Sequence, residues 1–154
     1  MDILYAGRYA RFRRLCHQVK VPSAETLRQA ANILVPLLEG YTDAVIVPMP
    51  SSCGKATDTL SLALELSRLR NIPVLDILEG APRAPLYRLK LEGRQPHDAS
   101  FFGFRLKAQP PEGARILLLD NVIATGRTMR AAMETLPTAT GLCLAADIEM
   151  MRQL

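Results

Sequence analysis

Long apolar runs are missing from this chain of 154 residues, and their absence excludes one class of protein. The aliphatic runs, such as residues 44–47 and 116–119, are brief. A membrane-spanning helix needs roughly 20 apolar residues, so we expect no membrane segment. Residues 1–14 hold no apolar stretch before a small-residue cleavage site, so they do not indicate a signal peptide.

Cysteine is scarce and widely spaced. Cys16, Cys53 and Cys143 are odd in number and far apart, which suits neither a disulfide framework nor a zinc site with paired ligands. This usage predicts a reducing compartment, the cytoplasm. Histidine is rarer still, and the isolated His17 and His97 are not expected to act as ligands or catalytic groups.

The remaining totals describe one globular domain. The chain is 49% hydrophobic and carries a net charge of only +4, which excludes a disordered protein. Its length suits a single domain over residues 1–154. The sequence pI near 9.2 fits an anionic ligand or a nucleic acid, or it has no functional meaning.

Helical and strand patterns alternate along the chain. The expected helices and strands are helix 9–19, helix 24–39, strand 44–47, a helix from 58, strand 73–78, strand 115–120, helix 128–136 and strand 142–148. Ser23 and Asp58 are expected to cap the helices that follow them. This alternation predicts an α/β fold with a mainly parallel sheet of about five strands flanked by helices.

One long segment interrupts the alternation. Residues 79–113 contain proline and glycine repeatedly, together with basic side chains. Connections of this length are usually functional lids or disordered segments. Arg88, Lys90 and Arg94 are therefore candidate lid cations, with ordinary solvated charges as the alternative.

Residues 116–129 carry the clearest chemical signal. Asp120 and Asn121 follow a buried strand, which places a carboxylate and an amide at the edge where parallel sheets bind ligands. The small polar loop 124–128 then leads into a helix, and amides at a helix start suit a phosphate group. Together these features predict a site for a 5-phosphorylated ribose; the alternative is an ordinary strand–turn–helix junction with Thr128 as a cap. The candidate phosphate-binding residues are Ala124, Thr125, Gly126, Arg127 and Thr128.

This segment resembles the signature of the type I phosphoribosyltransferase family: a hydrophobic strand, two acidic residues, two apolar residues and a Thr-Gly-x-Thr loop. Residues 43–50 resemble the family's first sheet strand and the start of its pyrophosphate loop. With the segment 9–20, they most resemble the competence-type (ComF-like) branch, without its four-cysteine zinc module. The resemblance implies a phosphoribosyltransferase-type fold with a small hood and a flexible loop, here in residues 1–22 and 80–104.

The resemblance also implies an activity. It is transfer of phosphoribose from 5-phosphoribosyl-1-pyrophosphate to a nitrogen acceptor with release of pyrophosphate, a glycosyltransferase reaction. Mg²⁺ would be bound mainly through the substrate, with no metal site from the protein alone. Asp120 and Asn121 take the catalytic positions, although Asn121 stands where the family has a second acid. The candidate pyrophosphate-binding residues are Ser51, Ser52, Cys53, Gly54 and Lys55, with an ordinary exposed loop that happens to contain a lysine as the alternative. The hood and lid of such proteins are often completed by a second subunit, so a homodimer is one expected partner.

A binding protein without turnover is the alternative function. The uncharged Asn121 and the small Ala124 favour a phosphoribosyl- or nucleotide-binding regulator, or an accessory protein in nucleic-acid metabolism or DNA uptake. Nucleic acid would contact the basic N-terminal segment, for which a solvated helix face or a subunit contact is the other interpretation. Its cations are Arg8, Arg11, Arg13, Arg14 and Lys20.

Overall fold

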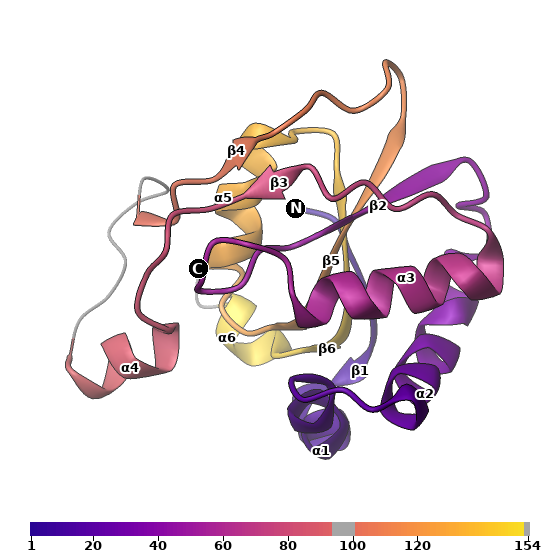
Figure 1. The fold of residues 1–154 in the computed structure, drawn as a ribbon. Coiled ribbons are helices and arrows are strands. Elements are labelled where there is room, and N and C mark those ends of the chain that lie inside the picture. The colour runs from indigo at the N-terminus through magenta and orange to yellow at the C-terminus, as the bar shows by residue number, and fades with distance from the viewer. Residues whose placement is uncertain (94–100, 153–154) are drawn as a thin grey trace.

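A four-stranded parallel sheet forms the centre of the computed structural model, which describes residues 1–93 and 101–152. The strands lie in the order β1–β6–β5–β2 (Figure 1), and every neighbouring pair is parallel. Their bounds are β1 Ile3–Arg8, β2 Ala44–Pro48, β5 Arg115–Ile123 and β6 Thr140–Ala146. The predicted α/β class with a parallel sheet flanked by helices is confirmed.

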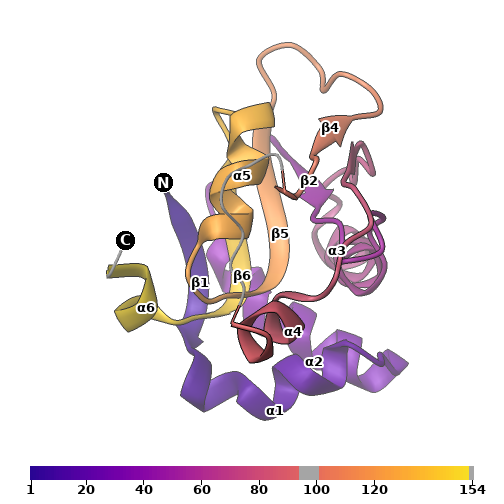
Figure 2. The same ribbon diagram turned by 90° about the vertical axis from the view of Figure 1, so that its left-hand side faces the viewer.

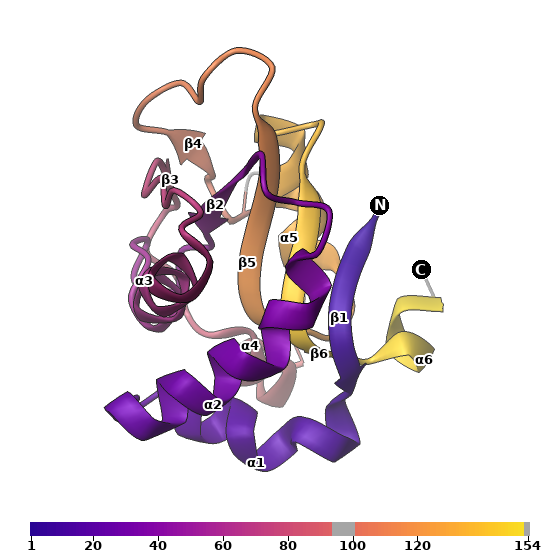
Figure 3. The same ribbon diagram turned by 90° about the vertical axis from the view of Figure 1, so that its right-hand side faces the viewer.

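Helices cover both faces of this sheet. They are α1 Tyr9–Val19, α2 Ala24–Leu34, the 3₁₀ helix η1 Val35–Leu38, α3 Asp58–Arg70, α4 Leu86–Leu91, α5 Arg127–Thr135 and α6 Ile148–Arg152. Figures 2 and 3, taken from opposite sides, show α5 on one face and α2 on the other. One apolar cluster joins the sheet to α1, α2 and α3, and a second joins it to α5. The two clusters fix the orientation of the central strands and therefore of their carboxyl ends.

The helix starts follow the capping rules in part. The Ser23 side chain accepts a hydrogen bond from the Thr26 backbone N–H at 3.1 Å, so the predicted cap of α2 is confirmed. The predicted cap at Asp58 is wrong, because Thr57 occupies that position and Asp58 is the first residue of α3. A carboxylate in the first turn still interacts favourably with the positive end of the helix.

The expected strand over 73–78 is wrong in extent. Val74 forms an isolated parallel bridge with Ile46, and the pairing stops there. The short β3, Leu78–Glu79, instead pairs antiparallel with β4, Arg105–Leu106. The main sheet therefore has four strands and not about five. A bridge this short reflects Pro73, which has no N–H to extend the ladder.

The other strand boundaries also shift. β1 was not predicted, and it forms the edge of the main sheet within the segment expected to be part of a hood. β5 continues three residues past Asp120 to Ile123. β6 ends at Ala146, because the chain turns into α6 two residues later. No helix in the described part of the chain is both long and apolar enough to cross a membrane.

Candidate functional site

The candidate site is built on the carboxyl-terminal part of β5, between β2 and β6. Residues 116–119 of this strand are buried in the core, which fixes the position of Asp120 and Asn121 directly after them. Asp120 is partly buried, and Asn121 is only 5% exposed. One oxygen of Asp120, Oδ1, accepts a hydrogen bond from the Asn121 backbone N–H at 2.8 Å.

A second carboxylate reaches this point from α3. The Asn121 side chain donates a hydrogen bond from Nδ2 to Oδ2 of Asp58. The other oxygen of Asp58 accepts a hydrogen bond from the Thr57 hydroxyl at 3.0 Å. The sequence analysis treated Asp58 only as a helix cap and missed its place in the site.

The surroundings of Asp120 disfavour its charged form. Burial raises the pKa of Asp120 from its ordinary value of 3.8 to about 6, and the negative charge of Asp58 acts in the same direction. The Asn121 backbone N–H and the more distant charges of Arg83 and Lys20 lower the pKa of Asp120 in opposition. At pH 7 most molecules therefore carry an ionised Asp120, which is an acceptor of hydrogen bonds.

Arg83 is a second site residue that the sequence analysis missed. Its guanidinium lies over the ring of Phe102 at 4.9 Å and over the ring of Phe101 at 5.8 Å. Burial lowers the pKa of Arg83, and attraction to Asp120 partly restores it. An arginine held between aromatic rings has already lost much of its freedom, so it presents its charge at a defined place.

The candidate pyrophosphate loop, residues 51–55, follows β2 at the same end of the sheet. It closes on itself, because the Ser51 N–H donates to the Lys55 carbonyl oxygen and the Gly54 N–H to the Ser51 carbonyl oxygen, both at 3.0 Å. The Arg83 N–H donates to the carbonyl oxygen of Ser52 at 2.8 Å. The loop and Arg83 therefore form one connected unit.

Two members of this loop have distinct environments. Gly54 has a φ of +90°, and a Cβ there would lie 2.4 Å from the Gly80 carbonyl oxygen, so the close approach requires glycine. Cys53 is exposed, and hydrogen bonding with the Ser51 side chain is the main cause that lowers the pKa of the Cys53 thiol. Lys55 is exposed, with its ammonium free to contact an anion.

The candidate phosphate loop, residues 124–128, leads from β5 into α5. Gly126 occupies the N-cap of α5 with a φ of +84°, and a glycine has no side chain with which to cap the helix. The Thr125 hydroxyl oxygen accepts a hydrogen bond from the Arg127 N–H at 3.3 Å. Thr128 is the second residue of α5, so the alternative in which Thr128 is the cap is wrong. The N–H groups of the first turn that follow Arg127 point toward the same end of the helix, and such groups suit a phosphate.

The candidate lid cations are placed only in part. Arg88 is exposed on α4, a short helix, and Lys90 lies on the same helix. Arg94 lies outside the described residues. Their role in closing the site stays a prediction.

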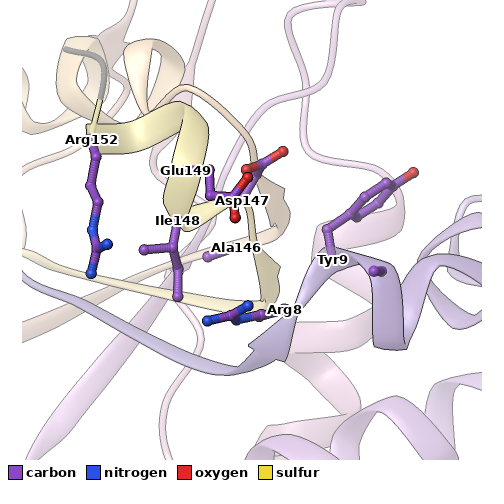
Figure 4. A pocket seen from close by; sticks show the side chains of 8 residues that line it. Arg8, Tyr9, Ala146, Asp147, Ile148, Glu149 and Arg152 are labelled. Carbon is purple, nitrogen blue, oxygen red and sulfur yellow. The ribbon is translucent and has the colours of Figure 1, made fainter.

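A pocket of about 310 Å³ lies beside the phosphate loop, where β1 and β6 end. The Asp147 N–H donates to the carbonyl oxygen of Ile123 at 2.9 Å, which ties the pocket wall to the end of β5. Figure 4 shows side chains from both ends of the described chain around it. The lining residues are Arg8, Tyr9, Ala10, Ala146, Asp147, Ile148, Glu149 and Arg152. The sequence analysis missed Asp147, although it follows a buried strand as Asp120 does.

The oxygen atoms at the end of β5 suit a weakly held magnesium ion. Among the residues that the structure describes, no group of three or more His, Cys, Asp or Glu side chains gathers to hold a metal. Asp58 and Asp120 nevertheless supply oxygen ligands, and the buried Oδ1 of Asn121 has no hydrogen-bond partner within residues 1–93 and 101–152. Mg²⁺ commonly takes one or two protein carboxylates and completes its shell with water and substrate phosphates.

Comparison with known proteins gives structural matches alone: no family model and no curated protein matches the sequence. An adenine phosphoribosyltransferase from Trypanosoma brucei, in complex with AMP, pyrophosphate and ribose-5-phosphate, aligns with a TM-score of 0.52. It is 14% identical, over 84% of this chain and 56% of that chain. An adenine phosphoribosyltransferase from Leishmania donovani aligns with a TM-score of 0.50 and 12% identity, over 85% of this chain and 69% of that chain. The α/β fold described above is therefore of the phosphoribosyltransferase type.

Proposed function

We propose that this protein binds 5-phosphoribosyl-1-pyrophosphate and transfers its phosphoribosyl group to a nitrogen acceptor. The observation that carries the proposal is the meeting of three features at one end of the sheet: the Asp120 carboxylate, the glycine-containing loop 124–128 and the closed loop 51–55. The fold shared with the adenine phosphoribosyltransferases supports it. We also propose that the protein belongs to the competence-type (ComF-like) branch of this family.

Each part of the donor has a matching partner. The 5-phosphate fits the N–H groups at the start of α5, where the helix dipole favours negative charge. The ribose hydroxyls donate to the ionised Asp120. The pyrophosphate fits the loop 51–55, where Arg83 and Lys55 supply positive charge beside it. The Trypanosoma brucei enzyme holds AMP, pyrophosphate and ribose-5-phosphate, which are ligands of the same chemical classes.

The proposed reaction breaks one bond and forms one. The bond between ribose C1 and the pyrophosphate oxygen breaks, and its electron pair leaves with pyrophosphate. A lone pair of the acceptor nitrogen forms the new bond to C1, and the acceptor's proton passes to solvent. Positive charge develops on the ribose ring meanwhile, and the nearby ionised Asp120 favours it. When bound, Mg²⁺ near Asp120 and Asp58 would offset the charge of the pyrophosphate.

The pocket beside the phosphate loop is the proposed acceptor site. It lies at the carboxyl ends of β1 and β6, next to the end of β5. Its wall offers the carboxylates of Asp147 and Glu149 as acceptors for N–H groups, and Arg8 and Arg152 as donors. A polar nitrogen heterocycle matches this mixture.

A release assay tests the proposal. The protein is incubated with the donor, Mg²⁺ and a panel of purines, pyrimidines and nicotinate-type acceptors, and pyrophosphate is measured. Release that depends on one acceptor supports the transfer reaction. No release above the level without protein, across the whole panel, would exclude a conventional salvage enzyme.

Asn121 favours a second candidate, a binding protein without turnover. An amide at this position contributes no charge to a developing cation, which weakens catalysis more than binding. This candidate predicts calorimetric binding of the donor without pyrophosphate release. For either candidate we propose a cytoplasmic location, since all three cysteines are free and two of them are buried.

A further inference from the structure

Asn121 is in an unusual electrostatic position for a neutral side chain. It is 5% exposed, and its Nδ2 donates to the carboxylate of Asp58. An ionised carboxylate has no proton to give, so the amide must turn its N–H toward Asp58. Its Oδ1 is thereby left buried without a hydrogen-bond partner among the residues that the structure describes.

A buried acceptor without a partner costs free energy, typically about 1–3 kcal/mol. Such a group in a folded protein calls for an explanation, and a ligand that donates a hydrogen bond is one. The neighbouring carboxylates of Asp58 and Asp120 are hydrogen-bond acceptors as well. They lie close enough together that the charge of Asp58 raises the pKa of Asp120. The ligand for this place must therefore donate hydrogen bonds or carry positive charge.

Two kinds of ligand satisfy such a group of oxygen atoms: a divalent cation, which is coordinated by their lone pairs, and a pair of neighbouring hydroxyl groups, which donate hydrogen bonds to them. A cation held by the protein alone is disfavoured, because no third acidic, histidine or cysteine side chain joins the cluster in the described part of the chain. Arg83 already supplies positive charge toward Asp120. Neutral hydroxyl groups can donate hydrogen bonds to the oxygen atoms of Asp58, Asp120 and Asn121 without adding further positive charge.

We infer that Asp58 is a sugar-recognising carboxylate, held toward the hydroxyl groups of a ribose phosphate by Asn121. In this arrangement the second carboxylate of the site comes from α3, while Asp120 on β5 supplies the first. Asn121 acts as a positioning residue through Nδ2 and accepts from the ligand through Oδ1. The inference rests on the proposed function, since it assigns a role within the same ribose site.

The placement of Asp58 suits this role. It is the first residue of α3, where the helix dipole stabilises a negative charge without neutralising it. Thr57 donates to one of its oxygens and Asn121 to the other. Each carboxylate oxygen retains a second lone pair, so Asp58 can still accept from a ligand.

The test compares two sugar phosphates by calorimetry. Ribose 5-phosphate has neighbouring hydroxyl groups at C2 and C3, whereas 2-deoxyribose 5-phosphate lacks one of them. We expect the protein to bind ribose 5-phosphate at least about tenfold more tightly, the effect of one hydrogen bond to a charged group. In Asp58→Asn this ratio should fall close to one, while affinity for the deoxy compound changes little. Asp43→Asn is the matched control, because Asp43 is an exposed carboxylate bonded to Arg115 at the opposite end of β5.

A charge exchange provides the second variant. In Asp58→Asn/Asn121→Asp the carboxylate moves to β5 and the amide to α3, so the hydrogen bond between them reverses and no net charge is lost. We expect this double variant to recover the preference for ribose 5-phosphate. If Asp58→Asn alone does not fold, as judged by circular dichroism, the double variant decides: a folded double variant with no preference overturns the role of Asp58.

The outcomes separate the inference from the proposed function. If the unmodified protein binds neither ribose 5-phosphate nor the pyrophosphorylated donor, the proposed function fails. If it binds both sugar phosphates equally, or if Asp58→Asn keeps the full preference, the inference fails while the proposed function stands. Tight binding of Mg²⁺ alone, lost in Asp58→Asn, would likewise overturn the assignment to hydroxyl groups.

Discussion

Asp120 carries an electrostatic cost in the folded protein. Its pKa is about 6 when folded and near 3.8 ordinarily, so the folded state binds the proton more tightly. The contribution of protonated Asp120 to the free energy of unfolding is fully present below about pH 4, and it is lost as the pH rises through 6. A carboxyl group with a strongly raised pKa at the end of a parallel strand is a candidate for ligand binding.

Replacement of Asp120 by asparagine should therefore separate stability from binding. Asp120→Asn keeps an oxygen for the Asn121 N–H but removes the charge. At pH 7.5 we expect the variant to be more stable than the unmodified protein by about 1–3 kcal/mol, and the difference to vanish near pH 4. Urea denaturation at both pH values measures this. Affinity for ribose 5-phosphate should fall at the same time; a variant that is more stable and binds equally well would remove Asp120 from the site.

Replacement of Arg83 should weaken the binding of pyrophosphate. Its guanidinium lies over Phe102, and its backbone N–H holds Ser52 of the pyrophosphate loop. Arg83→Gln keeps the backbone bond and removes the charge, so we expect roughly tenfold weaker binding of inorganic pyrophosphate with Mg²⁺. The exposed Arg70, at the end of α3, serves as the control in Arg70→Gln. Equal losses in both variants, measured by calorimetry, would assign the effect to net charge alone.

Of the individual residues at the candidate site, only some could be predicted from the sequence. Asp120 and the loop 124–128 were found because they follow a strongly apolar strand in the same stretch of chain. Asp58 and Asn121 are 63 residues apart, and no local pattern reports their contact. Arg83 looked like one of several basic residues in a long loop, and its aromatic contacts appear only in the folded chain.

The loops and helices around the site depend on backbone shape more than on side-chain chemistry. Gly54 and Gly40 both have a positive φ, of 90° and 79°, but only Gly54 approaches another backbone group closely. Alanine at either position carries the strain of the left-handed conformation. At Gly54 its Cβ would in addition meet the carbonyl oxygen of Gly80.

We therefore expect Gly54→Ala to damage the pyrophosphate loop far more than Gly40→Ala damages its own turn. Gly40→Ala should lower the free energy of unfolding by about 1 kcal/mol and leave ligand binding unchanged. Gly54→Ala should lower the free energy of unfolding by at least about 1 kcal/mol more than Gly40→Ala does, and it should weaken the binding of pyrophosphate. Thermal unfolding and calorimetry of the two variants check this. Equal destabilisation and unchanged pyrophosphate binding in both would show that the Gly54–Gly80 contact does not shape the loop.

The element pattern could be predicted where a single local signal was strong. The helix over 9–19 and the strand over 44–47 match α1 and β2 closely, because apolar spacing and β-branched content agree there. β1 contains alanine, glycine and arginine, so its strand character comes from pairing with β6, which the sequence does not show. Residues 73–78 have the composition of a strand but lie where the sheet provides one bridge with β2.

The whole molecule combines a parallel sheet with an uneven distribution of charge. α1 contains no acidic residue, and Arg11, Arg13 and Arg14 are all exposed on it. These cations belong to a helix that packs through its apolar side on the first core cluster. They do not line the pocket beside the phosphate loop. Part of the positive charge of the chain therefore lies on a helix whose arginines do not line the pocket.

This division permits a test of the nucleic-acid alternative that leaves the donor site intact. If α1 contacts nucleic acid, the unmodified protein should bind single- or double-stranded DNA with an affinity that falls steeply as salt rises. Arg11→Gln/Arg13→Gln/Arg14→Gln should reduce the slope of log affinity against log salt by roughly 2–3, since each phosphate contact contributes about 0.7–0.9. Donor binding should not change, because none of the three exposed arginines lines the pocket or takes part in the hydrogen bonds of Asp120 and Asn121. Fluorescence anisotropy over a salt series measures the slope, with Arg68→Gln on the exposed side of α3 as the control for net charge. If the slope is the same in the triple variant and the unmodified protein, α1 does not bind nucleic acid. Its arginines then form a solvated helix face whose positive charge has no ligand.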